Sequence, residues 1–141
     1  MLIERASVLF GVGALFDYND TLAIQFVISW LTSMTLLQQR DAETARRREE
    51  LRLATLVRLH ALLERMLPGR EVWVFGSVIQ PGAFRESSDV DLALREEPAE
   101  ISHYRLQSLL EEALGRPVDV VLLPESRFAE TILQEGQRWT P

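Results

Sequence analysis

Apolar residues in this chain recur either at helical spacing or in short runs that have the length of strands. Apolar stripes at helical spacing cover residues 41–67 and 99–114, and each segment is predicted to be an amphipathic helix. Residues 72–75 and 117–123 are apolar almost throughout, which is typical of buried strands. Acidic and apolar residues alternate at the start of residues 89–94. This strand is therefore predicted to have one solvent-exposed face and one buried face.

Residues that cap or break helices set the predicted ends of these elements. Asp41 is predicted to be the N-cap of the first helix, and Pro68-Gly69 is predicted to end it. Gly115 and Pro117 stop the second helix in the same way. The helix between the strand at 89–94 and the strand at 117–123 makes a crossover connection. The two strands are therefore expected to be parallel or next-nearest in one sheet.

A last helix is predicted to start at Pro124 and to end at Gly136. The residues of this helix that are predicted to face inward are Phe128, Ile132 and Leu133. Trp139, which follows the helix, is expected to pack against the core.

The N-terminal third of the chain is unusually hydrophobic. Residues 21–37 form a run of seventeen positions without a charge, at the short limit for a membrane span and diluted by Thr, Ser and Gln. Three interpretations stay open: a helix that is buried or covered by a partner, a membrane anchor, and translation in the cell from Met34. Membrane association is the least favoured of them. The predicted organisation is a hydrophobic extension over residues 1–40 and one domain over residues 41–141.

Composition narrows the function classes. At 141 residues and 47% hydrophobic content, the chain can bury the core of one domain. Absence of cysteine excludes disulfides and zinc–thiolate sites and is compatible with a reducing cytoplasm, where we place the protein. All fifteen basic residues are arginine, which disfavours P-loop chemistry because that chemistry places a lysine on the phosphates. The net charge of −6 disfavours direct nucleic-acid binding.

The candidate chemistry lies where the strands carry acidic residues. Asp89 and Asp91 share one face of their strand about 6–7 Å apart, and such a pair repels unless a cation lies between them. Oxygen ligands of this kind suit Mg²⁺ or Mn²⁺. An Asp-x-Asp pair alone is most often just the wet face of an edge strand. Here, however, Asp119 supplies a third strand carboxylate, and Gly76-Ser77 supplies backbone N–H groups and a hydroxyl. Together these residues predict metal-assisted phosphoryl or nucleotidyl transfer.

These residues resemble the signature of the minimal nucleotidyltransferases (MNT), within the DNA polymerase β-like superfamily. The resemblance implies an α+β fold, with a small mixed sheet and helices packed on one side. It also implies two divalent metal ions, Mg²⁺ or Mn²⁺, and ATP as the nucleotide donor. By the same resemblance, Gly76 and Ser77 would hold the triphosphate. Asp89, Asp91 and Asp119 would bind the metals, and Asp119 could also act as general base.

The resemblance covers roughly residues 50–138, including a closing Ile-Leu-Gln-Glu-Gly at 132–136. The spacer between Gly-Ser and the first aspartate departs from the family pattern. Members usually have ten residues there, often beginning Arg-x-Arg-Gly, whereas this chain has eleven, 78–88, and lacks those arginines.

The function that the resemblance implies is that of an antitoxin. Such a protein would transfer AMP from ATP to a hydroxyl, most simply that of a tyrosine, on a partner HEPN-type toxin, with which it would form a hetero-oligomer. Two alternatives stay open. One is an antitoxin that neutralises its toxin by binding alone, and the other is a nucleotidyltransferase that acts on a small-molecule hydroxyl.

Overall fold

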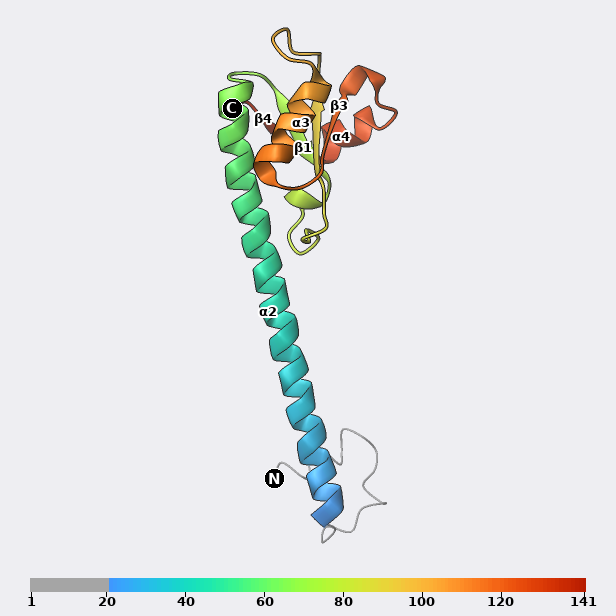
Figure 1. Cartoon of the computed structure of the whole chain (residues 1–141). Coiled ribbons are helices and arrows are strands. Elements are labelled where there is room, and N and C mark those ends of the chain that lie inside the picture. Colours follow the sequence, from blue (N-terminus) through green and yellow to red (C-terminus); the bar gives the residue numbers. More distant parts are fainter. Residues whose placement is uncertain (1–20) are drawn as a thin grey trace. The chain divides into compact units, whose positions relative to one another are not determined.

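The computed structural model describes residues 21–141, so the first twenty residues of the predicted extension lie outside the described residues. The chain divides into two compact units, Met1–Glu43 and Thr44–Pro141 (Figure 1). Helix α2, Thr21–Met66, contributes residues to both units. The predicted division at residues 40 and 41 stays a prediction.

In the first unit, α2 carries apolar side chains that are exposed. Over a window of 18 residues its mean hydropathy is 1.3, and none of that window is buried. By length and composition the helix is able to cross a membrane. Two of its hydroxyls are satisfied within the helix, because Thr32 Oγ1 donates to the Ile28 carbonyl and Thr35 Oγ1 donates to the Leu31 carbonyl. The large exposed side chains are Leu22, Ile24, Phe26, Val27, Ile28, Trp30, Leu31, Met34, Leu36 and Leu37.

Asp41 lies inside α2 and is not its N-cap, so this prediction was wrong. Residues 21–66 contain neither Gly nor Pro, and nothing in the sequence interrupts the helical hydrogen bonds. A residue that favours an N-cap is tolerated in the interior of a helix when its side chain is exposed, as Asp41 is.

In the second unit, four strands form one mixed sheet in the order β3-β2-β1-β4. The strands are β1 Val72–Phe75, β2 Val90–Leu94, β3 Val118–Leu122 and β4 Gln137–Trp139. Strand β1 is antiparallel to both β2 and β4, whereas β2 and β3 are parallel. This arrangement confirms the predicted α+β fold and the crossover between the two aspartate strands. Strand β4 was not predicted, because its three residues show no apolar alternation.

Residues 44–66 of α2 and helix α3, His103–Leu114, cover one face of the sheet. Alternate residues of β1, β2 and β3 point into this main core, where they meet leucines of the two helices. Phe84, from the loop before β2, is also fully buried there. The buried helix residues of this cluster are Leu59, Leu63, Leu106, Leu110 and Leu114.

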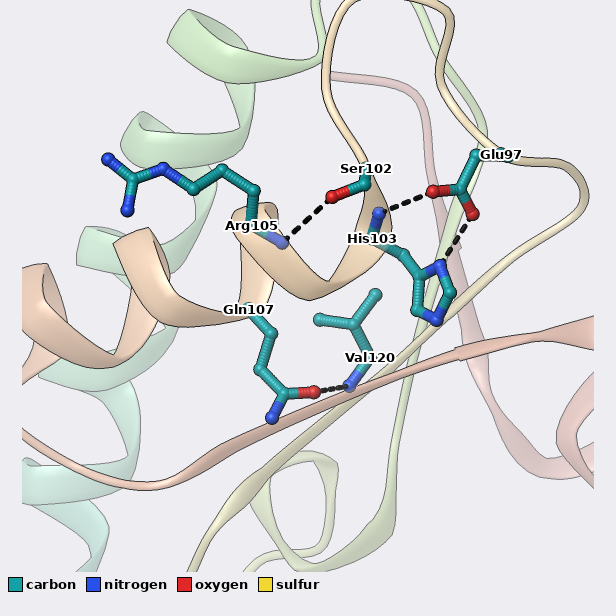
Figure 2. A network of polar contacts seen from close by, with 6 residues as sticks. All are labelled: Glu97, Ser102, His103, Arg105, Gln107 and Val120. Carbon is teal, nitrogen blue, oxygen red and sulfur yellow. Dashed lines mark hydrogen bonds and ion pairs between the residues drawn. The ribbon is translucent and has the colours of Figure 1, made fainter.

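Helix α3 is fixed at its start and along the free edge of β3 (Figure 2). The Ser102 hydroxyl caps the helix by accepting from the Arg105 N–H at 3.2 Å. Glu97 accepts from the His103 backbone N–H at 2.8 Å and contacts the ring Nδ1 of the same histidine. Further along, Gln107 Oε1 accepts from the Val120 N–H at 3.1 Å. Side chains of α3 therefore satisfy an edge strand that would otherwise offer its N–H groups to another chain.

Helix α4, Ala129–Glu135, packs beside a smaller cluster on the other face of the sheet. The chain first makes a 3-10 turn, Leu123–Glu125, so the helix starts five residues later than the predicted Pro124. With only seven residues, α4 buries Ile132 alone. Phe128 and Leu133 are 57% and 47% exposed, and the prediction that they face inward was wrong. Trp139 is half-buried against the main core, as predicted.

Candidate active site

Strand register places the candidate carboxylates at one end of the sheet. Asp91 of β2 lies directly opposite Asp119 of the parallel strand β3, and on its other side it pairs with Phe75, the last residue of β1. Because the neighbouring Val90 and Leu92 point into the main core, Asp91 points to the opposite face. Two carboxylates from strands 28 positions apart in the chain are thereby neighbours.

Asp89 lies one residue before β2, and its side chain is exposed. It is close enough for its charge to act on Asp91. The three predicted carboxylates therefore share one end of the sheet, with Asp91 half-buried and the other two exposed.

Among the carboxyl groups of residues 21–141, that of Asp91 has the pKa that is shifted furthest. Burial raises the pKa of Asp91 to about 6, and the negative charges of Asp89 and Asp119 add to this effect. Three carboxylates at one end of a sheet form a donor set of the kind that suits a divalent cation. Within residues 21–141, no group of three or more His, Asp or Glu side chains already stands in a metal-binding arrangement. That Asp89, Asp91 and Asp119 bind a metal ion therefore stays a prediction. Their carboxylate oxygens are ligands that suit a divalent cation.

Gly76 follows β1 and packs against Asp91. It opens a 3-10 turn, Gly76–Ile79, with a φ of +76°, a conformation that residues with a side chain rarely adopt. A Cβ at this position would overlap the Asp91 Oδ2 atom. Glycine is therefore required here both by the backbone conformation and by the close approach of the carboxylate.

The turn also positions Ser77, the second predicted nucleotide-binding residue. Ser77 is half-buried, and its carbonyl accepts from the Gln80 N–H at 3.1 Å, which closes the turn. The backbone thus folds back directly after β1 and keeps Gly76-Ser77 beside Asp91. The structure therefore brings Gly76, Asp91 and Asp119 together, with Ser77 adjacent in the chain.

The segment that leads into Asp89 is held by Arg116, a residue that the sequence analysis did not single out. Arg116 Nη1 donates to the Ser88 carbonyl at 2.9 Å, and its guanidinium lies 4.5 Å from the centroid of the Phe84 ring. Burial lowers the pKa of Arg116. Its place two residues before β3 was visible in the sequence, but nothing there indicated that it reaches back to the loop before β2.

A second arginine that was not predicted from the sequence contacts the Gly76–Ile79 turn. Arg52 of α2 is only 8% exposed, and its Nη1 donates to the Val78 carbonyl at 3.2 Å. Its other guanidinium nitrogens donate to Glu49, at 2.9 Å from Nε and 2.6 Å from Nη2. An apolar helix face with one arginine at a core position was the signal that could have revealed it.

Comparison with known proteins gives a family match and likenesses to solved structures, among them two toxin–antitoxin complexes. The family model for polymerase β nucleotidyltransferases (Polymerase beta, Nucleotidyltransferase) matches residues 59–138. A crystal structure of a toxin–antitoxin complex with AMP-PNP contains a chain that is 26% identical, with a TM-score of 0.47 over 60% of this chain and 72% of that chain. A crystal structure of the toxin–antitoxin pair MntA–HepT contains a chain that is 21% identical, with a TM-score of 0.45 over 63% of this chain and 73% of that chain. No curated protein matches.

Proposed function

The chain belongs to the polymerase β nucleotidyltransferase family, and from this premise we propose that it is an antitoxin that transfers AMP from ATP to a hydroxyl of a partner HEPN-type toxin. The observation that carries the proposal is the register of β2 and β3, which makes Asp91 and Asp119 neighbours beside Gly76. The MNT-like pattern of the sequence supports the antitoxin role.

In the proposed reaction, the acceptor hydroxyl oxygen attacks the α-phosphorus of ATP. The bond from that phosphorus to the bridging oxygen breaks, and pyrophosphate leaves. Gly76 and Ser77 hold the triphosphate, since a residue without a Cβ lets phosphate oxygens approach the backbone N–H groups and Ser77 adds a hydroxyl donor. Asp119, which is exposed at the site, accepts the proton of the attacking hydroxyl.

Asp89, Asp91 and Asp119 would hold Mg²⁺, for which Mn²⁺ could substitute. When bound, these ions supply the positive charge that lowers the pKa of the attacking hydroxyl and neutralises the leaving pyrophosphate. The raised pKa of Asp91 supports this assignment, because a cation among the three carboxylates would relieve their repulsion.

The acceptor is proposed to be a tyrosine of the toxin, with which this protein forms a hetero-oligomer in the cytoplasm. Asp89 and Asp119 are exposed, so a side chain from another protein has access to the reacting end of the site. An added AMP group brings a phosphate charge to the toxin. That charge would repel the RNA backbone from an RNA-cleaving site.

The test is the mass of the partner after reaction. The toxin is incubated with this protein, ATP and Mg²⁺. The chains are then separated, and the molecular mass of the toxin is measured. We expect an increase of one AMP or a multiple, absent with Asp91→Asn. The same change at the exposed helix residue Asp41, Asp41→Asn, should leave transfer intact. A toxin that is inhibited without gaining mass, and recovers once separated, would favour an antitoxin that acts by binding alone.

A further inference from the structure

Arg52 is a buried cation whose donors are divided between two partners. Two guanidinium nitrogens reach the Glu49 carboxylate one turn earlier on α2, in a bidentate pairing. The third nitrogen crosses to the carbonyl of Val78, 26 positions away in the chain. A buried arginine is costly unless its charge is paired and its donors are used, and here both conditions are met.

The segment that this pair contacts is the one that presents Gly76 and Ser77. Val78 is the third residue of the 3-10 turn that Gly76 opens, and its side chain is fully buried. The hydrogen bond from Arg52 lowers the pKa of the Glu49 carboxyl, and the backbone of Gly82, further along the same loop, adds a smaller effect in the same direction. Arg52 therefore contacts the Gly76–Ile79 turn itself, and the charge of Glu49 is influenced by the same loop at Gly82, four residues beyond Val78.

Another ion pair on the same helix shows what an ordinary surface contact looks like. Arg46 and Glu50 lie 3.4 Å apart with 73% and 65% of their side chains exposed, and such pairs contribute little. The side chain of Arg52 is 10% exposed, and its pair spans α2 and the loop. The acceptor that completes the pairing of Arg52 thus lies in the Gly76–Ile79 turn and not on its own helix.

We propose that Glu49 and Arg52 form a clamp that holds the Gly76–Ser77 turn in the conformation that receives the triphosphate of the nucleotide donor. Both are positioning residues, since they act through the loop and not on the substrate. This inference rests on the proposed function and names two residues of α2 on which its nucleotide site depends.

The first experiment compares Arg52→Met with Arg46→Met in the full chain. Methionine keeps most of the side-chain volume and removes the donors, and the two variants change the net charge equally. The Kd of a non-hydrolysable ATP analogue with Mg²⁺ is measured by calorimetry. We expect Arg52→Met to raise this Kd roughly tenfold, as for the loss of a buried charged hydrogen bond, and Arg46→Met to leave it unchanged. In the transfer assay, KM for ATP should rise while KM for the toxin stays constant.

Loss of stability must be separated from loss of positioning. Leu106→Ala opens a cavity in the core under α3 and serves as a destabilised variant with an intact clamp. It should bind the analogue normally wherever it is folded. Arg52→Lys keeps the charge but cannot serve both partners, so it should recover only part of the affinity. In hydrogen exchange, the Gln80 amide, which closes the turn, should exchange faster in Arg52→Met than in Leu106→Ala.

If Arg52→Met does not fold, the comparison passes to Glu49→Gln against Glu50→Gln, and only the former should weaken analogue binding, by about threefold. If the folded Glu49 and Arg52 variants bind the analogue normally, the clamp proposal is wrong. The proposed function is not affected by that result, since the wild-type protein would still bind nucleotide. Absence of binding by the wild-type protein would overturn the proposed function and the clamp with it.

Discussion

Asp91 is the residue at which stability and proposed chemistry oppose each other. It is half-buried between the ends of two neighbouring strands, and two further carboxylates act on it. A folded protein would lower its free energy by replacing this carboxylate with a neutral group. Its presence is explained if a bound cation, and not the fold, compensates the charge.

The pKa of Asp91 predicts how stability depends on pH in metal-free protein. Its folded value of about 6 lies above the ordinary value of 3.8. Folding therefore favours the protonated form, and the stability that this form provides is complete below pH 4 and lost as the pH rises through 6. At pH 7, Asp91→Asn should be more stable than wild type by on the order of 1 kcal/mol, after allowance for solvent screening.

Denaturant unfolding of wild type and Asp91→Asn at several pH values, with a chelator present, measures this difference. The difference should vanish near pH 4, where both side chains are neutral. A constant difference between pH 4 and 7 would contradict the assignment of the effect to this carboxyl.

Gly76 gives a second prediction at the scale of single residues. Alanine there has to adopt a φ of +76°, at a cost of about 1–2 kcal/mol, and its Cβ also overlaps Asp91. In an Asp91→Ala background the overlap disappears and only the backbone cost remains. Unfolding free energies of the double-mutant cycle should therefore be non-additive by about 1 kcal/mol.

The control for this cycle is Gly82→Ala, because Gly82 has a φ of +81° and nothing within 4 Å of a Cβ. It should show the backbone cost alone, without coupling to Asp91. Additive costs at Gly76 and Asp91 would mean that the two residues do not touch.

Among the elements, the long helix α2 combines two kinds of surface. From Thr44 onward it carries leucines and Arg52 that are buried in the second unit, whereas residues 21–37 expose apolar side chains. A protein that begins at Met34 should unfold cooperatively within about 0.5 kcal/mol of the full chain, because the removed side chains that the structure describes are exposed. Nucleotide binding should be unchanged and aggregation reduced.

Chemical unfolding and size-exclusion chromatography of the two proteins test this prediction. An insoluble or molten product would show instead that residues before Met34 are integral to the fold. It would also remove the interpretation in which translation starts at Met34.

The sequence predicted those elements best whose physical signal is local. The strands of Asp91 and Asp119 follow from alternation and apolar runs, and their parallel pairing follows from the intervening helix. The start of α2 could not be predicted in the same way, because Asp41 is compatible with a cap and with an exposed interior position. Strand β4 forms only because β1 offers it a free edge, which its own residues do not reveal.

Within the candidate site, the sequence predicted only those residues whose chemistry can be recognised from a single residue and its near neighbours. Asp89, Asp91, Asp119 and the Gly-Ser pair are recognisable by type and spacing, although their role as ligands stays a prediction. Arg52 and Arg116 are not recognisable in this way. Each reaches a carbonyl more than twenty positions away, and such a contact depends on packing that has no local pattern.

At the scale of the whole molecule, the chain is acidic. It carries 21 acidic and 15 basic residues, for a net charge of −6. An RNA-cleaving partner needs a basic surface to hold its substrate, and that surface is complementary in sign to this protein. The opposite charges of the two surfaces therefore favour the proposed complex. This protein does not need to bind RNA itself in order to act on its partner.

The crossover between β2 and β3 also has a consequence for biosynthesis. During translation, Gly76, Ser77 and Asp91 leave the ribosome before α3 and Asp119 do, and the parallel pair cannot form until the crossover helix is available to pack on the sheet. Closing this non-local pairing is among the slower steps of folding. A nascent or partly folded copy therefore lacks its third carboxylate, and the candidate site is complete only after the crossover helix has packed on the sheet.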